Sequence, residues 1–148
     1  MSKILGAPII IILIALFFAP PANAQTIKKV NFETIDKGEY SNYKDNDRQH
    51  SIEIYNQQEW QVFWNQHIGG LSPKPLLPKV DFKDYLVIAA IDEIRFSGGY
   101  TLEIEEVTID TSVENRPFGI IIKLKQPGSA AATTGALTRP YHIVKIKR

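Results

Sequence analysis

The chain has 148 residues, of which 44% are hydrophobic, with 17 Lys and Arg residues against 16 Asp and Glu residues and no cysteine. This length is typical of one domain, and the apolar content excludes an intrinsically disordered protein. A net charge of +1 excludes the basic field that nucleic-acid-binding proteins use to hold phosphates. The lack of cysteine excludes disulfides, thiol nucleophiles and thiolate metal ligands.

The first 24 residues have the organisation of a secretory signal peptide. Lys3 provides the positive start, Ile9–Phe18 is an uninterrupted apolar run, and Ala22 and Ala24 are the small residues that precede a cleavage site. We therefore expect cleavage between Ala24 and Gln25. The alternative, an uncleaved membrane anchor, is less favoured because the apolar stretch is shorter than the roughly 20 residues that span a bilayer.

Residues 25–148 are then expected to form a single domain that is secreted or periplasmic. Once Lys3 is removed, 16 basic residues balance 16 acidic ones. Without a cysteine for lipidation, we expect no stable membrane anchor after cleavage. Without disulfides, the stability of an exported domain has to come from a packed core, which about 124 residues can provide.

Two segments of the first half show the alternation of a strand. Residues 25–35 predict a first strand and residues 50–55 a second one, in which Ile52 and Ile54 share a face. Between them, the polar and turn-forming segment 39–49 predicts a surface loop.

A helix is predicted to begin at Asn56 and to end at Gly69-Gly70. Asn56 is a favourable N-cap residue, and Glu59 stands three positions later, as in a capping box. Large side chains recur at helical spacing and are expected to pack into the core: Trp60, Phe63, Trp64 and His67. The segment 71–79 contains three prolines and predicts an extended connector.

The rest of the chain predicts a sheet. Residues 85–91 form a continuous apolar run, typical of a central strand that is buried on both faces. Residues 100–109 alternate until Glu105-Glu106, where one extra residue indicates a β-bulge. Residues 118–125 and 141–146 predict the last two strands. The predicted fold is α+β, mainly an antiparallel β sheet or sandwich with one inserted α-helix.

No catalytic constellation can be recognised. The histidines His50, His67 and His142 lack the spacing of metal ligands, and the chain has no G-x-S-x-G motif. The neighbouring carboxylates Asp92-Glu93 and Glu105-Glu106 do not converge on one substrate atom, because adjacent strand residues point to opposite faces. They are expected on a solvated face or in a loop. We therefore assign no catalytic residue, no metal and no cofactor, and expect neither an enzyme nor a nucleic-acid-binding protein.

Two loops combine turn residues with residue types that are common in protein interfaces. The first contains paired glycines, which permit a tight turn; an ordinary hairpin turn is the simpler interpretation. The second presents an arginine and a tyrosine around a proline; a proline at the start of a strand, with the tyrosine in the core, is the simpler interpretation. The candidate partner-binding residues are Ser97, Gly98, Gly99 and Tyr100 in the first loop and Arg139, Pro140 and Tyr141 in the second.

The order and spacing of several motifs resemble the PrcB C-terminal domain family of exported bacterial proteins. The matching motifs are Glu59-Trp60 with Phe63-Trp64, Val80-Asp81-Phe82, Ser97-Gly98-Gly99-Tyr100 with Leu102-Glu103-Ile104, Pro127-Gly128, and Thr138-Arg139-Pro140-Tyr141-His142-Ile143-Val144. The similarity extends from about Phe32 to Lys147. It implies a non-catalytic protein-interaction domain. The family takes its name from an accessory subunit of a subtilisin-like surface protease complex.

A fainter similarity implies a different function. Gly98-Gly99-Tyr100 and Arg139-Pro140-Tyr141 are similar to two loops of the chagasin-like inhibitors of cysteine proteases, which lie together at one end of a sandwich. The alternative is therefore a protease inhibitor that acts through the Ser97–Tyr100 and Arg139–Tyr141 loops. This alternative requires the two loops to be adjacent, whereas a general interaction domain does not.

Overall fold

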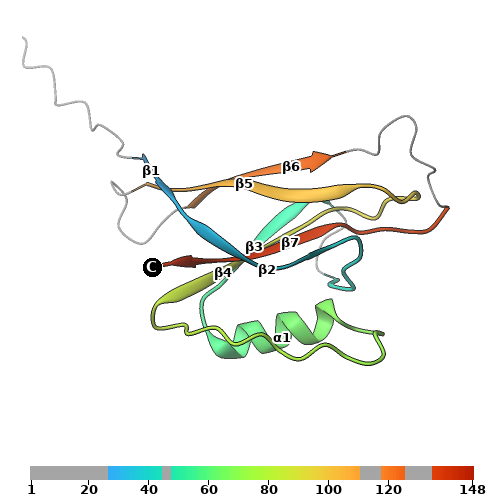
Figure 1. The fold of residues 1–148 in the computed structure, drawn as a ribbon, viewed down its shortest axis with the longest axis horizontal. Helices are drawn as coiled ribbons and strands as arrows, with labels where there is room; N and C mark the ends of the chain where they lie inside the picture. Colours follow the sequence, from blue (N-terminus) through green and yellow to red (C-terminus); the bar gives the residue numbers. More distant parts are fainter. Residues whose placement is uncertain (1–26, 45–47, 111–117, 126–134) are drawn as a thin grey trace, which may run out of the picture.

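The structure is a computed structural model, and it describes residues 27–44, 48–110, 118–125 and 135–148. The predicted signal peptide and its cleavage between Ala24 and Gln25 lie outside these residues. Within them, seven strands and one helix follow one another along the chain (Figure 1). They are β1 (Ile27–Val30), β2 (Phe32–Gly38), β3 (His50–Ile54), α1 (Gln57–His67), β4 (Tyr85–Ile91), β5 (Thr101–Asp110), β6 (Phe118–Lys125) and β7 (Tyr141–Lys147).

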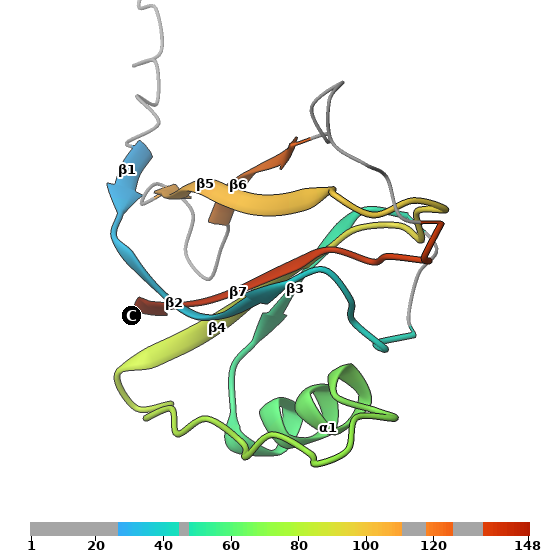
Figure 2. The same ribbon diagram turned by 45° about the vertical axis from the view of Figure 1, so that its right-hand side comes forward.

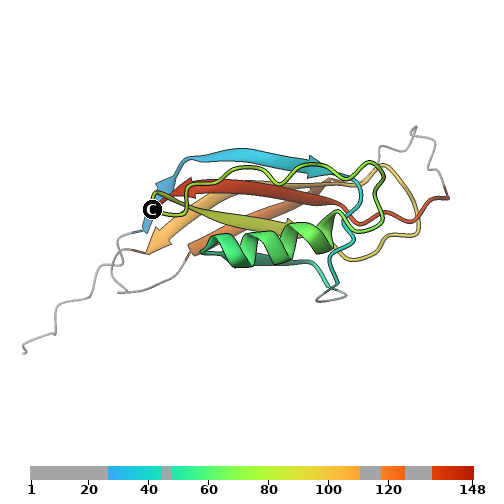
Figure 3. The ribbon, with the colours of Figure 1, turned by 90° about the horizontal axis from the view of Figure 1, so that it is seen from below.

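The strands form two antiparallel sheets that face each other. One sheet has the strand order β1-β5-β6 and the other the order β2-β7-β4-β3. Seen from below, α1 and the connector that follows it lie side by side over the second sheet (Figure 3). The predicted α+β fold, mainly antiparallel β with a single helix, is confirmed.

The first predicted strand is in fact two strands that belong to different sheets. Val30 pairs with Val107 of β5, whereas Phe32 pairs with Ile146 of β7, so the chain changes sheet at Asn31 (Figure 2). Both Val30 and Phe32 pack against the apolar core between the sheets. The apolar and polar residues continue to alternate across the bend, and the sequence pattern therefore contained no sign of it.

Strand β4 separates two apolar clusters, as its continuous apolar sequence predicted. Leu86, Ile88 and Ala90 belong to the cluster between the two sheets. Val87, Ala89 and Ile91 belong to the cluster between the second sheet and α1. Alternate side chains of a strand point to opposite faces, so a strand in the middle of three layers needs apolar residues at every position.

The helix α1 begins and packs as predicted. The Oδ1 atom of Asn56 accepts a hydrogen bond from the backbone N–H of Glu59 at 2.9 Å, and the Glu59 carboxylate accepts one from the N–H of Tyr55 at 2.8 Å. The four large side chains predicted to face the core, Trp60, Phe63, Trp64 and His67, are all buried. In the described part of the chain, no helix is both long and apolar enough to cross a membrane.

The predicted bulge in β5 is also confirmed. Ile104 pairs with Ile122 and Glu106 with Ile121, which leaves Glu105 as the extra residue. The turn before β5 has Gly99 at a φ of 86°, a backbone conformation that favours glycine. However, it is not a hairpin turn, because it connects β4 of one sheet to β5 of the other.

Candidate functional site

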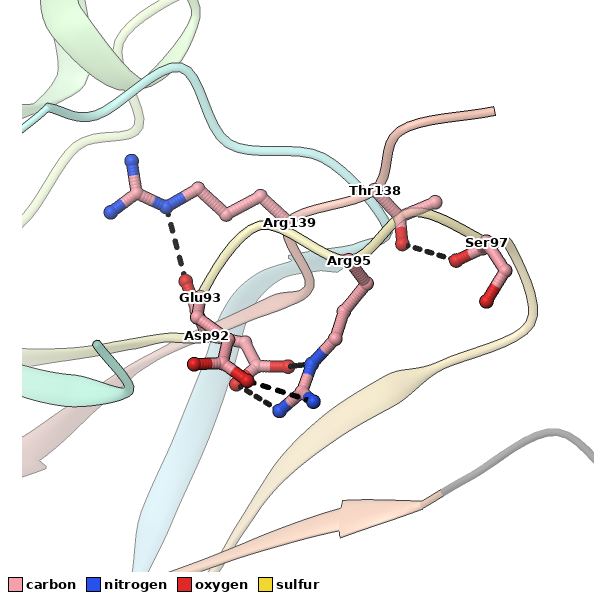
Figure 4. A network of polar contacts seen from close by, with 6 residues as sticks. All are labelled: Asp92, Glu93, Arg95, Ser97, Thr138 and Arg139. Carbon is pink, nitrogen blue, oxygen red and sulfur yellow. Dashed lines mark hydrogen bonds and ion pairs between the residues drawn. The ribbon is translucent and has the colours of Figure 1, made fainter. Parts of the chain in front are cut away.

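The two loops singled out in the sequence lie side by side. Arg95 and Thr138 exchange two backbone hydrogen bonds, of 2.7 and 2.9 Å. The hydroxyl of Thr138 also donates to the carbonyl oxygen of Ser97 at 2.8 Å (Figure 4). We call the segments 92–100 and 135–140 together the tip, since they lie at the end of the sandwich where β4 ends and β7 begins (Figure 1). The adjacency that an inhibitor would require is therefore present.

A buried ion pair holds the first segment of the tip. The Asp92 side chain is fully buried and accepts two hydrogen bonds from Arg95, at 2.9 Å from Nε and 3.1 Å from Nη2. The Asp92 carboxylate also raises the pKa of the Arg95 guanidinium, since it stabilises the charged form. A third contact joins Arg95 Nη1 to Glu93 at 2.9 Å. The expectation that Asp92 lies on a solvated surface is therefore wrong.

The buried side chain of Arg139 stabilises the tip through hydrogen bonds to backbone carbonyl groups. This side chain is only 4% exposed. The Nε atom donates to the carbonyl oxygen of Asp92 at 3.0 Å, and Nη1 donates to the carbonyl oxygen of Tyr43. Pro140 is buried as well, and its carbonyl oxygen accepts from the Asp92 N–H at 2.9 Å. The prediction that this loop presents its arginine outward is wrong, because the guanidinium satisfies carbonyl groups of irregular segments.

The other predicted partner-binding residues differ in exposure. Gly99 is exposed, Ser97 and Tyr100 are half-buried, and Gly98 is buried. The Tyr100 ring lies 5.3 Å from the Arg95 guanidinium carbon, which is cation–π distance. Tyr141 is half-buried, and its hydroxyl donates to Asp36 at 3.1 Å; burial raises the pKa of this hydroxyl. Whether these residues bind a partner stays a prediction.

The residues that the tip does expose are not among those predicted from the sequence. Phe96 is 85% exposed, Leu137 is 53% exposed and Ile94 is 44% exposed. Ile94 and Phe96 flank Arg95, so in an extended segment they point away from the side where Arg95 meets Asp92. Leu137 directly precedes Thr138, which bonds to the same segment. The alternation of Ile94, Arg95 and Phe96 was a signal that could have indicated this apolar surface.

A second polar cluster resembles a catalytic triad in its composition. The Ser41 hydroxyl lies 2.9 Å from Nδ1 of His67, and Nε2 of His67 lies 3.6 Å from Asp36. The contact with His67 lowers the pKa of Asp36. However, Ser41 is 1% exposed, and its oxygen also accepts a bond from the Tyr43 N–H at 3.2 Å. A nucleophile needs access to its substrate, so this cluster joins the helix to the loop after β2 rather than forming an active site.

His142 links the two sheets. Its Nδ1 atom accepts a hydrogen bond from the Ile104 N–H at 2.9 Å, and Nε2 lies 2.8 Å from the Thr34 hydroxyl. Since Nδ1 accepts, the ring is neutral and carries its proton on Nε2. Burial lowers the pKa of His142, and the Lys37 ammonium lowers it further, while Glu103 opposes both effects.

Acid is expected to destabilise the protein through His142. Its folded-state pKa lies below the ordinary value of 6.5, so the unfolded chain binds the proton more readily. The free energy of unfolding should therefore decline as the pH falls through 6.5, until the folded-state pKa is passed. Urea unfolding between pH 5 and 8 measures this slope. His142→Gln should reduce the slope; equal slopes in the parent and His142→Gln would contradict the assignment.

The fold and the tip define a class: a two-sheet β domain with one covering helix and two loops locked together at one end. The family model described as PrcB C-terminal matches residues 86–147, which include β4 except its first residue, β5 to β7 and both segments of the tip. The match supports the resemblance to the PrcB C-terminal family that the motifs of this segment indicated. The match does not reach β2, β3 or α1, to which the sequence resemblance extends. No curated protein and no solved structure matches the chain.

Proposed function

We propose that the protein is an exported, non-catalytic interaction domain that binds a partner protein through the tip. In this proposal residues 1–24 are removed as a signal peptide, and residues 25–148 act as a single domain in the periplasm or outside the cell. The observation that carries the proposal is the exposure of Phe96, Leu137 and Ile94 on a rigid part of the molecule. Clustered apolar side chains on a protein surface are typical of interaction sites.

The contacts beneath the tip explain why it suits binding. Phe96 follows Arg95, which Asp92 holds with two hydrogen bonds, and precedes Ser97, which Thr138 holds. A side chain on such a fixed backbone loses little conformational entropy when it binds. Aromatic residues at the centre of an interface contribute a large share of binding free energy. Phe96 is therefore the proposed anchor.

The partner we favour is an exported protease, which the protein would serve as an accessory subunit. The match to the PrcB C-terminal family model is consistent with a protease-associated accessory domain. The burial of Ser41 also removes the triad-like cluster as a competing catalytic centre. Recovery of an exported protease with the tagged protein, and its loss when the tip is altered, would support this role.

A protease inhibitor is the second candidate, and the adjacency of the two loops favours it. Backbone bonds between Arg95 and Thr138 place both segments at the same end of the sandwich, as entry into an active-site cleft would require. Titration against papain-like and subtilisin-like proteases separates the two candidates. Stoichiometric loss of protease activity would indicate an inhibitor, and binding with full activity would indicate an accessory subunit.

Phe96→Ala is expected to weaken partner binding at least tenfold, because truncation of an interface anchor costs about 2 kcal/mol or more. The free energy of unfolding should change by less than about 0.5 kcal/mol, since the side chain is exposed. Isothermal titration with the recovered partner and urea unfolding provide the two measurements. Leu76→Ala is the matched control, since Leu76 is 90% exposed but lies in the connector. Equal affinities of both variants would refute the tip as the binding site.

A further inference from the structure

A second surface lies along β3 and α1, on residues that the tip does not share. An open groove of about 470 Å³ runs between this strand and the helix. Its apolar lining comes from Ile52 and Ile54 of β3 and from Val62 and Phe63 of α1. Val62 is 54% exposed although it is apolar. The groove therefore joins the outer strand of a sheet to the exposed side chain of Val62 on the helix.

Strand β3 lies at an edge of its sheet and, unlike the other three edge strands, contains no lysine, proline or bulge. β3 pairs with β4 in continuous register from His50 to Ile54, and no strand pairs with its other side among the residues that the structure describes. Proteins commonly block such edges with lysines, prolines or bulges, because unpaired backbone groups accept further strands. The three other edge strands carry such features: Lys28 and Lys29 in β1, Lys37 and a register shift in β2, and Lys123 and Lys125 in β6. β3 has none of them.

The charge of the groove limits what could occupy it. Glu53 and Glu59 contribute carboxylates, and no lysine or arginine is among the groove residues that the structure describes. A second copy of β3 would bring another Glu53 and no lysine or arginine, so it would add negative charge to an edge that already carries carboxylates. A basic segment would instead be attracted.

We infer that β3 accepts an extended segment of another polypeptide as an added strand. Backbone hydrogen bonds to the free edge would supply part of the affinity. Apolar side chains at alternate positions of the segment would face Ile52, Ile54 and Val62 in the groove. Basic side chains at the positions between them would point to the opposite face, near Glu53. Strand addition of this kind is a peptide-binding function separate from partner binding at the tip.

A labelled peptide tests this inference. The probe is a fluorescein-labelled heptapeptide of sequence Lys-Val-Thr-Ile-Lys-Val-Thr, titrated with the purified protein by fluorescence anisotropy. We expect saturable binding that weakens at least tenfold when glutamate replaces both lysines, and also when alternate backbone amides are N-methylated. Equal binding of the N-methylated peptide would overturn strand addition, and equal binding of the acidic peptide would overturn the charge argument. Absence of binding at millimolar protein would overturn the inference as a whole.

A pair of helix variants locates the site. Val62→Lys places a positive charge in the groove, whereas Gln61→Lys places the same charge on an exposed neighbouring position that does not line it. We expect Val62→Lys to bind the basic probe at least tenfold more weakly and Gln61→Lys to bind it like the parent. Equal affinities would place the peptide elsewhere and overturn the inference. Sedimentation velocity tests whether a second copy of the chain occupies the edge instead. A dimer that Val62→Lys dissociates would show this and would overturn the inference.

Discussion

Replacing Trp60 by alanine is expected to lower the free energy of unfolding by about 4 kcal/mol, within the range for a buried large aromatic side chain. Trp60 is fully buried, and its ring stacks on Phe63 at 5.8 Å and packs against Trp64 at 5.2 Å. Its Nε1 atom donates to the carbonyl oxygen of Pro78 at 2.9 Å. The substitution would therefore leave a cavity under the helix and also release the connector from α1.

Urea unfolding monitored by circular dichroism measures this effect. Gln61→Ala is the matched control, because Gln61 is the next residue of the same helix and is exposed. The control should stay within about 0.5 kcal/mol of the parent. A loss of less than about 1 kcal/mol for Trp60→Ala would show that α1 contributes little to the fold. The result also tests whether the domain extends beyond the family match, since α1 lies before residues 86–147.

Replacing Asp92 by alanine is expected to lower the free energy of unfolding by about 3 kcal/mol. Removal of one partner from a buried ion pair leaves the other charge without compensation. Here Arg95 would lose both hydrogen bonds to the carboxylate, and its side chain is three-quarters buried. The Arg95 side chain would then keep only Glu93 as an ionic partner, so the tip should lose part of its defined shape, and partner binding should weaken together with stability.

Glu93→Ala is the matched control for Asp92→Ala. Glu93 contacts the same guanidinium at 2.9 Å, but its side chain is 44% exposed. Exposed ion pairs contribute between about 0 and 1 kcal/mol, so this variant should remain close to the parent in both stability and binding. Similar losses in the two variants would contradict the special role of burial at Asp92.

The two large effects should also be separable in a binding assay. Trp60 and Asp92 belong to different parts of the molecule, the helix layer and the tip. Under conditions in which Trp60→Ala remains folded, it should bind a tip partner with parental affinity, whereas Asp92→Ala should not. Equal losses of affinity would indicate that the tip depends on the helix layer. The comparison therefore distinguishes a local effect on the tip from general loss of stability.

Local patterns were sufficient to predict most of the elements. The capping residues Asn56 and Glu59 located the start of α1, because a helix end is satisfied by residues close in sequence. The uninterrupted apolar run located β4 and its two buried faces, and the slip in alternation located the bulge at Glu105. The change of sheet at Asn31 was missed, since pairing partners about 75 to 115 residues away decide it.

Local patterns in the sequence were enough to predict the fold class, the resemblance of segment 86–147 to a known family and the position of the two tip loops. Which residues of these loops face outward depends on contacts that form only when the chain folds. Arg139 carries a charge that by composition belongs on a surface, yet it is buried because the carbonyl oxygens of Asp92 and Tyr43 converge on it. Phe96 is apolar and by composition belongs in a core, yet it is exposed because Arg95 beside it is held inward by Asp92. Burial depends on which distant groups meet in space, and a one-dimensional pattern does not contain that information.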